Sequence, residues 1–412
     1  MKEVSSESPL IPEVGVLALV PDTWGGPWQP RHHVLTRLAQ TFPVVWVNPA
    51  PYWRSLLPGA VADDWAFDFD GSTPPGFRIY TPEAWLPEVY RPPVVGRWMR
   101  RERLRRARRV LARQGCEKTI LYVWRPEHAG ALDLVEHDLS CYHIDDEYTF
   151  SPVEQPQSAV EAALIGRVDQ VFIHSRGLLE KKGTLNPHTR FIPNGVDYPG
   201  YTLFHPIPPD LAAVPQPRIG YVGLIKPQLD LALLHALARQ HPGWSFVLVG
   251  PVPDREPLAS RVRQLAQLPN VHLLGAKPVS ALPAYVQHLD VCLLCYAMDD
   301  YTKYIYPMKL HEYLATGRPV IGTPIRSLQA FDDVVCLART PAEWSTAIAR
   351  ALEPGALSPA AVRARRTVAR EHDWDRIVSE IATTMAERLG PAYRDRWELV
   401  RPPHPPSTAF RQ

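Results

Sequence analysis

A lysine and a glutamate three residues apart, Lys309 and Glu312, stand where the sequence predicts the start of a short helix. Pro307 suits a helix start, because proline lacks the N–H that the first turn leaves unpaired. Leu310 begins an apolar face at helical spacing, and Gly317 suits the left-handed residue that ends a helix. The helix start offers unpaired N–H groups to an anion, beside a cation and a carboxylate. The combination suits a ligand with phosphate at one end and hydroxyls at the other.

The run Pro-Met-Lys-Leu-His-Glu-Tyr-Leu-Ala-Thr-Gly-Arg-Pro-Val over residues 307–320 resembles the donor-nucleotide motif of GT-B-fold glycosyltransferases. The resemblance implies that Glu312 hydrogen-bonds the ribose hydroxyls of a nucleotide-sugar. It also implies that the helix start, with Lys309 and Leu310, faces the diphosphate. The alternative is an ordinary strand–helix–strand unit with a surface lysine and glutamate.

In the second half of the chain, two glycines and two lysines stand just after predicted strands: Gly223, Lys226, Gly250 and Lys277. Ligands of open parallel sheets lie at the carboxyl ends of the strands, where a glycine admits a phosphate and a lysine neutralises it. The resemblance implies that these residues contact the donor. Tyr304 occupies the position where retaining members often carry a second glutamate, so the donor-sugar contact there and the stereochemistry stay open.

The first half offers a candidate base after the predicted strand 140–144, where His143, Asp145 and Asp146 cluster. Glycosyl transfer needs the acceptor hydroxyl to lose a proton, and a carboxylate or histidine can accept it. We rank Asp145 first, then Asp146, then His143. The alternative is a pair of aspartates that caps a loop.

A glycine-bearing loop follows the first predicted strand and contains Gly25 and Gly26, with His33 just beyond at the start of a helix. It resembles the family loop that approaches the donor phosphates and the acceptor. A histidine that only faces solvent is the alternative for His33.

Short apolar runs alternate with amphipathic helical patterns along the chain, which predicts parallel sheets covered on both faces. The fold class we expect is α/β, with two doubly wound Rossmann-like domains that face a central cleft, as the GT-B resemblance implies. The predicted strands are residues 14–20, 44–48, 77–80, 119–124, 140–144, 170–174, 218–222, 245–249, 270–274, 290–296, 319–322 and 334–338.

Proline clusters and a late amphipathic pattern suggest the domain boundaries. We predict an N-terminal acceptor-binding domain (1–198), a Pro-rich linker (199–217), a donor-binding domain (218–372), a crossover helix back to the N-terminal domain (373–390) and a Pro-rich tail (391–412).

Composition excludes several classes of protein. A chain of 412 residues with a net charge of +2 suits two domains and gives no signal for nucleic-acid binding. Five cysteines, an odd and sparse number, suit a reducing compartment. The polar N-terminus and the lack of a long apolar run predict a cytoplasmic protein. We find neither a dinucleotide fingerprint nor a metal-ligand spacing, so we expect no bound metal or cofactor.

Residues 97–113 hold nine arginines against one acid, Glu102, with apolar residues between them. A basic helix with an apolar edge can bind an anionic membrane surface, such as the inner face of the plasma membrane. A solvated helix is the alternative.

Together these features predict a metal-independent glycosyltransferase of the hexosyl type. Its donor would be a UDP-, GDP- or dTDP-linked sugar, and its acceptor a saccharide or a lipid-linked molecule. The chain resembles bacterial members that build cell-surface polysaccharides, teichuronic-type polymers or glycolipids. The alternatives are a GT-B-fold sugar-nucleotide epimerase and a non-catalytic protein that binds a sugar or nucleotide.

Overall fold

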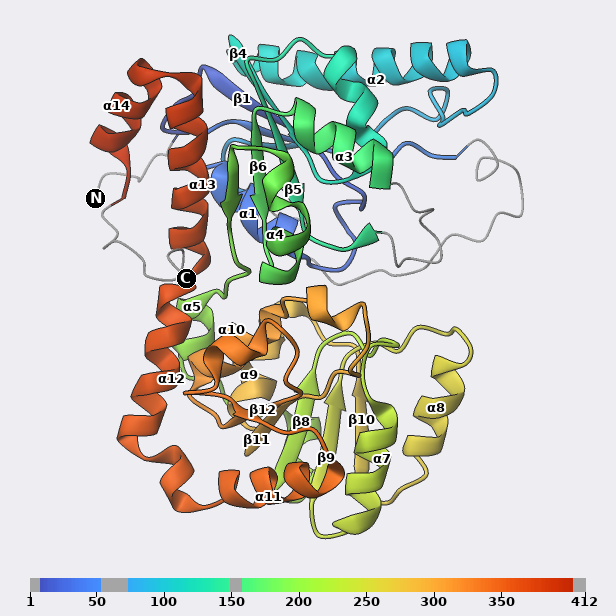
Figure 1. The fold of residues 1–412 in the computed structure, drawn as a ribbon, viewed down its shortest axis with the longest axis vertical. Helices are drawn as coiled ribbons and strands as arrows, with labels where there is room; N and C mark the ends of the chain where they lie inside the picture. Colours follow the sequence, from blue (N-terminus) through green and yellow to red (C-terminus); the bar gives the residue numbers. More distant parts are fainter. Residues whose placement is uncertain (1–7, 53–72, 149–157, 403–412) are drawn as a thin grey trace. The chain divides into compact units, whose positions relative to one another are not determined.

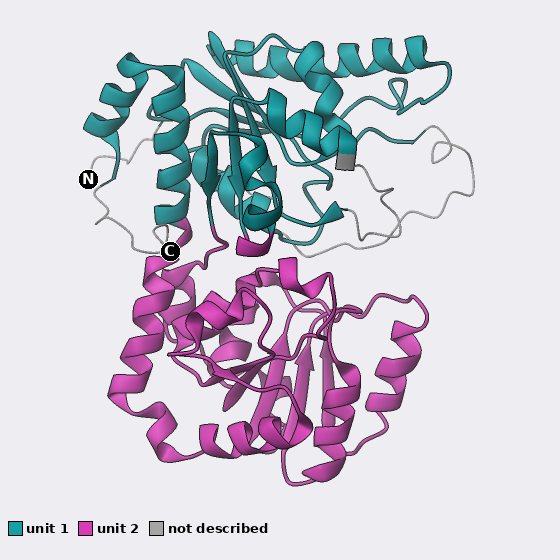
Figure 2. Cartoon of the chain, in the orientation of Figure 1, with its two compact units in different colours: residues 1–174, 178–192, 375–406 teal, residues 175–177, 193–374, 407–412 magenta. Residues whose placement is uncertain are grey.

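The computed structural model describes residues 8–52, 73–148 and 158–402. These residues form two compact units (Figure 2). Unit 1 comprises the described residues up to His174, residues 178–192 and the residues from Asp375 onward. Unit 2 comprises residues 175–177 and 193–374. Each unit contains one parallel β-sheet flanked by helices (Figure 1).

The sheet of unit 1 has seven strands in the order β3-β2-β1-β4-β5-β6-β7. The chain moves outward from β1 to β3 and then crosses to β4 on the other side of β1, so the order reverses between β1 and β4. Ligands of doubly wound sheets bind beyond the carboxyl ends of the strands at such a point. The strands are β1 (Val14–Leu19), β2 (Val44–Val47), β3 (Phe77–Tyr80), β4 (Lys118–Val123), β5 (Leu139–Ile144), β6 (Gln170–Ile173) and β7 (Thr189–Phe191).

The central strands of unit 1 are buried along their length, which explains their continuous apolar sequence. The helices before residue 193 and after residue 373 are α1 (Pro30–Leu38), α2 (Pro93–Arg113), η2 (Pro126–Asp133), α3 (Ser158–Arg167), α4 (Arg176–Lys182), η4 (Gly183–Leu185), α13 (Trp374–Leu389) and α14 (Pro391–Val400).

Helix α13 buries the apolar positions that recur every four residues, Ile377, Ile381 and Met385, each with no exposed surface. The predicted Pro-rich tail begins with a helix, since residues 391–400 form α14. Trp397 holds α14 in place, because its indole is 2% exposed and donates a hydrogen bond of 2.8 Å to Thr383. The remainder of the predicted tail, residues 403–412, lies outside the described residues.

The sheet of unit 2 has six parallel strands in the order β10-β9-β8-β11-β12-β13, and its order reverses between β8 and β11. The strands are β8 (Arg218–Val222), β9 (Ser245–Val249), β10 (Val271–Gly275), β11 (Val291–Leu294), β12 (Val320–Gly322) and β13 (Cys336–Leu337). The helices are α5 (Tyr198–Thr202), α6 (Pro209–Ala212), α7 (Leu231–Gln240), α8 (Leu258–Leu265), η5 (Val279–Ala281), α9 (Leu282–Gln287), η6 (Thr302–Tyr304), α10 (Met308–Thr316), η7 (Leu328–Phe331), α11 (Pro341–Ala351), η8 (Pro354–Leu357) and α12 (Pro359–Glu371).

The Pro-rich residues 199–217 are part of unit 2, where a linker between domains was expected. They contain α5 and α6, and Tyr201 and Leu211 belong to the apolar core of this unit. The side chain of Gln287 donates hydrogen bonds to the carbonyls of Tyr201 and Leu203, at 3.0 and 2.5 Å. Helices of four and five residues are too short to give a periodic pattern, so the sequence showed only the prolines.

Candidate functional site

Helix α10 of unit 2 carries the lysine and the glutamate with which the sequence analysis began. The helix begins at Met308, with Pro307 as the preceding cap, and it ends at Gly317, whose φ of 80° is left-handed as predicted. The Tyr313 hydroxyl accepts a hydrogen bond of 2.8 Å from the backbone N–H of Val222, which fixes α10 against the end of β8. The Leu310 side chain has no exposed surface, so only its backbone can take part in ligand binding.

Two glycines shape the carboxyl ends of the neighbouring strands β8 and β9. Gly223 and Gly250 have φ values of 140° and 143°, which side-chain-bearing residues rarely adopt. A Cβ atom on Gly223 would lie 1.9 Å from Cε of Lys309, so the lysine side chain lies directly over this glycine. A Cβ atom on Gly250 would lie 2.1 Å from the carbonyl oxygen of Gly223. The glycines therefore let the backbone of both strand ends and the lysine converge.

The two charged residues of this site, Lys309 and Glu312, are half-buried. Burial lowers the pKa of Lys309, and Glu312 acts in the opposite direction. Burial also raises the pKa of Glu312, against which Lys309 and a hydrogen bond with the Tyr201 hydroxyl act. A phosphate beside the Lys309 ammonium, and a hydroxyl beside the Glu312 carboxylate, would each replace interactions with water that the charged group loses on burial. Sequence reasoning missed Tyr201, because nothing in the Pro-rich segment marks one tyrosine as functional.

The other predicted donor residues are placed differently. The Lys277 ammonium donates to Asp210 at 2.8 Å and lies 5.6 Å from the centre of the Tyr285 ring, so its charge is held by an ion pair within unit 2. Lys226 is half-buried in the loop after β8. Tyr304 ends η6, and the Lys303 ammonium lies 5.1 Å from the centre of its ring. Roles for Lys226 and Tyr304 in donor binding stay predictions.

In unit 1, Asp145 follows β5 as expected, but it is held in a buried ion pair. Its Oδ2 accepts from Arg31 at 2.7 Å and its Oδ1 from the Tyr148 hydroxyl at 2.8 Å. Arg31 also pairs with Asp22. Burial alone would raise the pKa of Asp145, but Arg31 and then Arg125 outweigh it and hold the pKa below its usual range. Asp145 is therefore ionised, tightly held and a weak base, and its arginine partner was not foreseen.

The two neighbouring candidates for the base differ in accessibility. His143 is 3% exposed, its Nδ1 is hydrogen-bonded to the Tyr122 hydroxyl at 2.7 Å, and its ring stacks on Trp124 at 4.1 Å. Burial lowers the pKa of His143 to about 3. The ring is therefore neutral and packs as a core residue. Asp146 is half-buried, and its Oδ1 accepts a hydrogen bond of 2.8 Å from the backbone N–H of Glu147. Asp146 is thus less buried than His143.

The glycine-bearing loop after β1 is open at its tip. A Cβ atom on Gly25 would meet no atom within 4 Å, whereas one on Gly26 would lie 3.1 Å from a backbone oxygen. At the start of α1, His32 rather than His33 forms the cap, since its Nδ1 accepts the N–H of the residue three positions earlier at 3.0 Å. Burial, followed by the charge of Arg37, holds the pKa of His33 well below its usual range. The lowered pKa favours the neutral ring, and a role of His33 in phosphate or acceptor binding stays a prediction.

A cavity of about 1030 Å³ opens at the reversal point of the unit 1 sheet. Its walls include residues 19–21 after β1, residues 47–50 after β2 and residues 125–131 after β4. The sequence did not reveal this cavity, because the segments that form it are distant along the chain.

The arginines of α2 fall into two groups. Five are paired with acids, since Arg100 and Arg103 contact Glu88, Arg105 and Arg106 contact Glu102, and Arg108 contacts Glu136. The other four have no ion pair among the described residues: Arg97, Arg101, Arg109 and Arg113.

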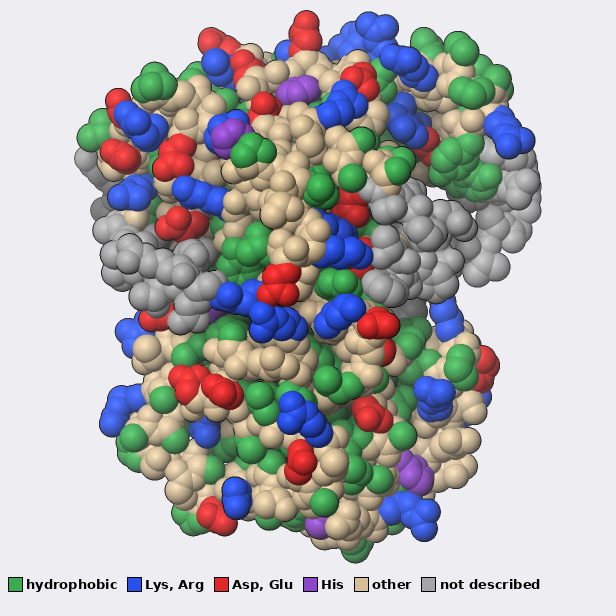
Figure 3. All heavy atoms as spheres, in the orientation of Figure 1, with side chains coloured by type: hydrophobic (Ala, Val, Ile, Leu, Met, Phe, Trp, Pro, Cys, Tyr) green, Lys and Arg blue, Asp and Glu red, His purple; other side chains and the backbone are tan. Residues whose placement is uncertain are grey.

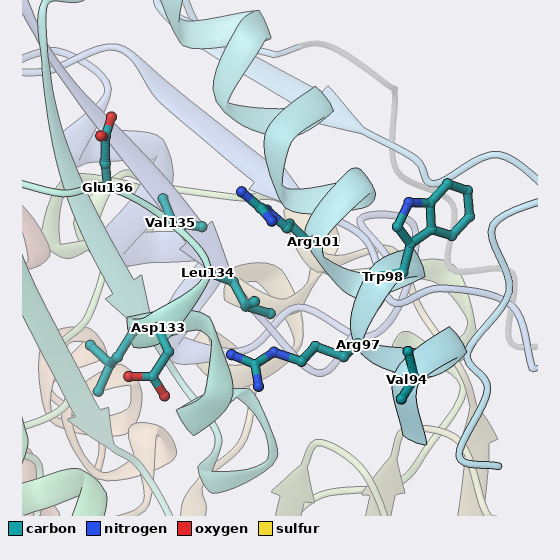
Figure 4. Close-up of a pocket in the computed structure, with 9 residues that line it drawn as sticks. Val94, Arg97, Trp98, Arg101, Asp133, Leu134, Val135 and Glu136 are labelled. Carbon is teal, nitrogen blue, oxygen red and sulfur yellow. The ribbon is translucent and has the colours of Figure 1, made fainter. Parts of the chain in front are cut away.

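The beginning of α2 combines unpaired arginines with exposed apolar side chains. Val94 is 80% and Trp98 57% exposed. Figure 4 shows Arg97 and Arg101 reaching toward the loop with Leu134, while Trp98 points to the other side of the helix. In Figure 3, basic and apolar side chains lie next to one another along the edge of unit 1 that carries α2. None of the helices within the described ranges is long and apolar enough to cross a bilayer.

A metal site would need several ligands in one place. In residues 8–52, 73–148 and 158–402 we find no group of three or more His, Cys, Asp or Glu side chains that could hold an ion.

Two doubly wound parallel sheets in two units define the GT-B fold class, and comparison with solved structures confirms this prediction. The structure of HepE from Anabaena in complex with UDP-glucose aligns with 91% of this chain and 99% of its own, with a TM-score of 0.64 and 15% identity. A glycosyltransferase from Rickettsia africae aligns with 92% of this chain and 99% of its own, with a TM-score of 0.67 and 12% identity. At these identities the likeness concerns the fold.

Sequence comparison shows which protein family the residues of unit 2 resemble. Residues 216–354 match the family model of glycosyl transferases group 1. The chain is also 31% identical over 179 residues to TuaH of Bacillus subtilis strain 168, described as a teichuronic acid biosynthesis glycosyltransferase. That alignment covers 41% of this chain and 44% of the relative, which is less than half of either.

Proposed function

We propose that this protein is a glycosyltransferase that moves a sugar from a nucleotide-diphosphate sugar to a hydroxyl acceptor in the biosynthesis of a cell-surface polysaccharide or glycolipid. The observation that carries the proposal is the placement of Lys309 over Gly223, with Glu312 one turn along α10, within the residues that match the family model of glycosyl transferases group 1. Both the family model and the Bacillus relative are named for glycosyl transfer, so they give no support to the epimerase alternative.

The donor would bind at the carboxyl ends of β8 and β9. The start of α10 and the Lys309 ammonium would stabilise the negative charge that develops on the leaving diphosphate. In many enzymes a metal ion stabilises this charge. Glu312, supported by the Tyr201 hydroxyl, would accept hydrogen bonds from the ribose. UDP-glucose is the first donor to test, since the solved HepE structure contains it.

The acceptor would bind to unit 1, and we place the base for its hydroxyl at Asp146. Asp145 is buried in its ion pair with Arg31, and a carboxylate with a lowered pKa is a poor proton acceptor. Asp146 follows directly, with part of its side chain accessible. In this arrangement Asp145 would order the loop that presents Asp146.

Helix α2 would bring the protein to an anionic membrane surface on the cytoplasmic side. Its unpaired arginines supply the charge, and the exposed Trp98 and Val94 supply apolar groups that insert at an interface. A basic residue near such a surface contributes about 1 kcal/mol, and the attraction weakens with salt.

Replacement of Glu312 tests the donor site. Glu312→Ala should weaken UDP-glucose binding by about 10- to 150-fold, since hydrogen bonds to a charged group contribute about 1.5–3 kcal/mol. Calorimetry with UDP-glucose, GDP-mannose and dTDP-glucose would identify the nucleotide. The exposed Glu353 provides a control variant, Glu353→Ala, in the same unit. A folded Glu312→Ala protein with wild-type affinity for the preferred donor would refute the assignment.

Product analysis separates the classes of function. Incubation with donor and acceptor should yield a glycosylated acceptor and a nucleoside diphosphate. Conversion of the donor sugar to its epimer without acceptor would show an epimerase, and binding without any turnover would show a non-catalytic protein.

Vesicle sedimentation tests the membrane contact with two triple variants of equal charge change. Replacing the unpaired Arg97, Arg101 and Arg109 with Gln should release the protein from anionic vesicles at low salt. Replacing the ion-paired Arg105, Arg106 and Arg108 should have a smaller effect, because acids already neutralise these side chains. Equal losses in both variants, or no sedimentation of the wild-type protein, would remove the membrane from the proposal.

A further inference from the structure

The cavity at the reversal point of the unit 1 sheet has the position of a substrate site, and its walls indicate what it would bind. Its volume of about 1030 Å³ is at the upper end of the range of small-molecule sites. Most of its wall is apolar, with side chains such as Leu19, Val47, Leu104 and Val160. Val160 is 48% exposed, so part of this apolar surface is open to a ligand.

Two of the neutral polar side chains of the wall, Asn48 and His128, offer little to a ligand, while the other two, Tyr52 and Tyr90, are exposed. Asn48 accepts hydrogen bonds of 2.9 Å from the Trp24 backbone and from the Trp46 indole, and its amide donates to Thr81 at 2.8 Å. Burial lowers the pKa of His128 to about 4, so this ring is uncharged at pH 7. Asn48 and His128 are therefore poor partners for the hydroxyls of a bare saccharide, and polar recognition in the cavity depends on its charged side chains and its two tyrosines.

The charged side chains of the wall are three arginines, Arg100, Arg103 and Arg125, and two glutamates, Glu88 and Glu127, so the wall carries a net charge of +1. Arg100 and Arg103 share one carboxylate, Glu88, so the three groups together carry one net positive charge. Arg103 is 5% exposed and also donates to the carbonyls of Leu86 and Pro87, whereas the Arg100 side chain is 34% exposed and can reach a ligand.

Arg125 adds a further cation, and it links the cavity to the carboxylate loop. Its guanidinium lies 4.5 Å from the centre of the Tyr148 ring, and the Tyr148 hydroxyl donates to Asp145. A ligand held beside Arg125 would therefore lie close to the loop in which we place the base.

We propose that this cavity binds an anionic head group attached to an apolar chain, and that it thereby holds the lipid-linked end of the acceptor. The apolar wall would take the chain, and Arg100 and Arg125 would take the anion. The inference that the ligand is an acceptor rests on the proposed glycosyl transfer. The binding of the ligand to the cavity requires no donor and can be measured without it.

Three soluble probes separate the parts of the ligand, each used below its micelle concentration and without donor. Octyl phosphate carries both parts, inorganic phosphate only the anion, and octyl β-glucoside only the chain with a neutral head. Titration followed by NMR should show octyl phosphate binding at least tenfold more tightly than either of the others. Equal binding of inorganic phosphate would reduce the site to an anion site, and equal binding of octyl glucoside would reduce it to an apolar one. Either result would overturn the proposal.

Two neighbouring arginines provide a matched pair of variants. Arg100→Gln should weaken octyl phosphate about tenfold, because it removes a charge-assisted contact. Arg101→Gln should not, because Arg101 lines the separate hollow beside Leu134 (Figure 4). Ala50→Trp, which fills the cavity from a half-buried loop position, should abolish binding. Wild-type affinity for octyl phosphate in both Arg100→Gln and Ala50→Trp would place the ligand elsewhere.

A measurement of donor binding distinguishes a failure of this inference from a failure of the proposed function. Arg100→Gln should bind UDP-glucose as the wild-type protein does. If octyl phosphate fails to bind while the donor binds and a sugar is transferred, the inference fails and the glycosyltransferase stands.

Discussion

Replacement of Gly223 by alanine should displace Lys309 from the donor site. The added Cβ would lie 1.9 Å from Cε and 2.5 Å from Nζ of the lysine, and the φ of 140° would strain any side-chain-bearing residue. The lysine is flexible, so it would move away rather than force the strand apart. We therefore expect two separate effects, one on stability and one on donor affinity.

The stability effect comes from the backbone. A non-glycine residue in a sparsely populated conformation costs about 1–3 kcal/mol. For a domain of this size, each kcal/mol lowers the melting temperature by about 2–4 °C. Gly243→Ala is the matched control, because its Cβ would meet no atom within 4 Å and its φ lies outside the strained range. Thermal unfolding should show a decrease for Gly223→Ala and no comparable change for Gly243→Ala.

The affinity effect comes from the lost ammonium. Calorimetry with the preferred nucleotide-sugar should show binding about 10- to 150-fold weaker, since an interaction with a charged group contributes about 1.5–3 kcal/mol. Lys309→Ala should weaken binding by a similar factor, and the double variant should be little worse than either single one, because both remove the same contact. Wild-type affinity in folded Gly223→Ala, or fully additive losses in the double variant, would refute this account of the site.

Three other measurements test the remaining steps. Donor affinity should fall as pH rises through the lowered pKa of Lys309, below the pH at which an ordinary lysine titrates, and it should also fall as pH decreases through the raised pKa of Glu312. Calorimetry across pH that shows a flat profile would contradict both assignments. Asp146→Asn should reduce turnover by about 100-fold or more without a change in melting temperature. Asp145→Asn should destabilise the fold by about 1.5–3 kcal/mol, because it removes one of the two carboxylates that pair with the buried Arg31; the reverse pattern would return the role of base to Asp145. Tyr201→Phe should weaken donor binding less than Glu312→Ala does, and an unchanged affinity in that variant would separate Tyr201 from ribose recognition.

Most of the predicted strands are buried along their length, which gives them the continuous apolar runs on which the prediction was based. Residues 77–80, 218–222 and 245–249 were predicted with the bounds that the structure has, and the other predicted strands differ by a few residues at their ends. The strand it did not predict, β7, has three residues of which none is fully buried, so it lacks the apolar run that marks the others.

The site was predicted only as far as local pattern determines it. The cap at Gly317 and the proximity of Lys309 to Glu312 are properties of one helix, and spacing alone shows them. The ion pair of Arg31 with Asp145 joins residues 114 positions apart, and no local pattern contains it. Long-range contacts of this kind changed the ranking of the base from Asp145 to Asp146.

The division of the chain has a consequence for its synthesis on the ribosome. The sheet of unit 1 is complete at residue 192, but α13 and α14 follow only after about 180 further residues that belong to unit 2. At about 5–20 residues per second, the nascent sheet would wait for about 10–40 s before Ile377, Ile381 and Met385 could cover it. Unit 2 is continuous over residues 193–374 and can fold as soon as it leaves the exit tunnel. The half of the molecule that is made first is therefore the half that is finished last, and we expect nascent-chain chaperones to bind it during that interval.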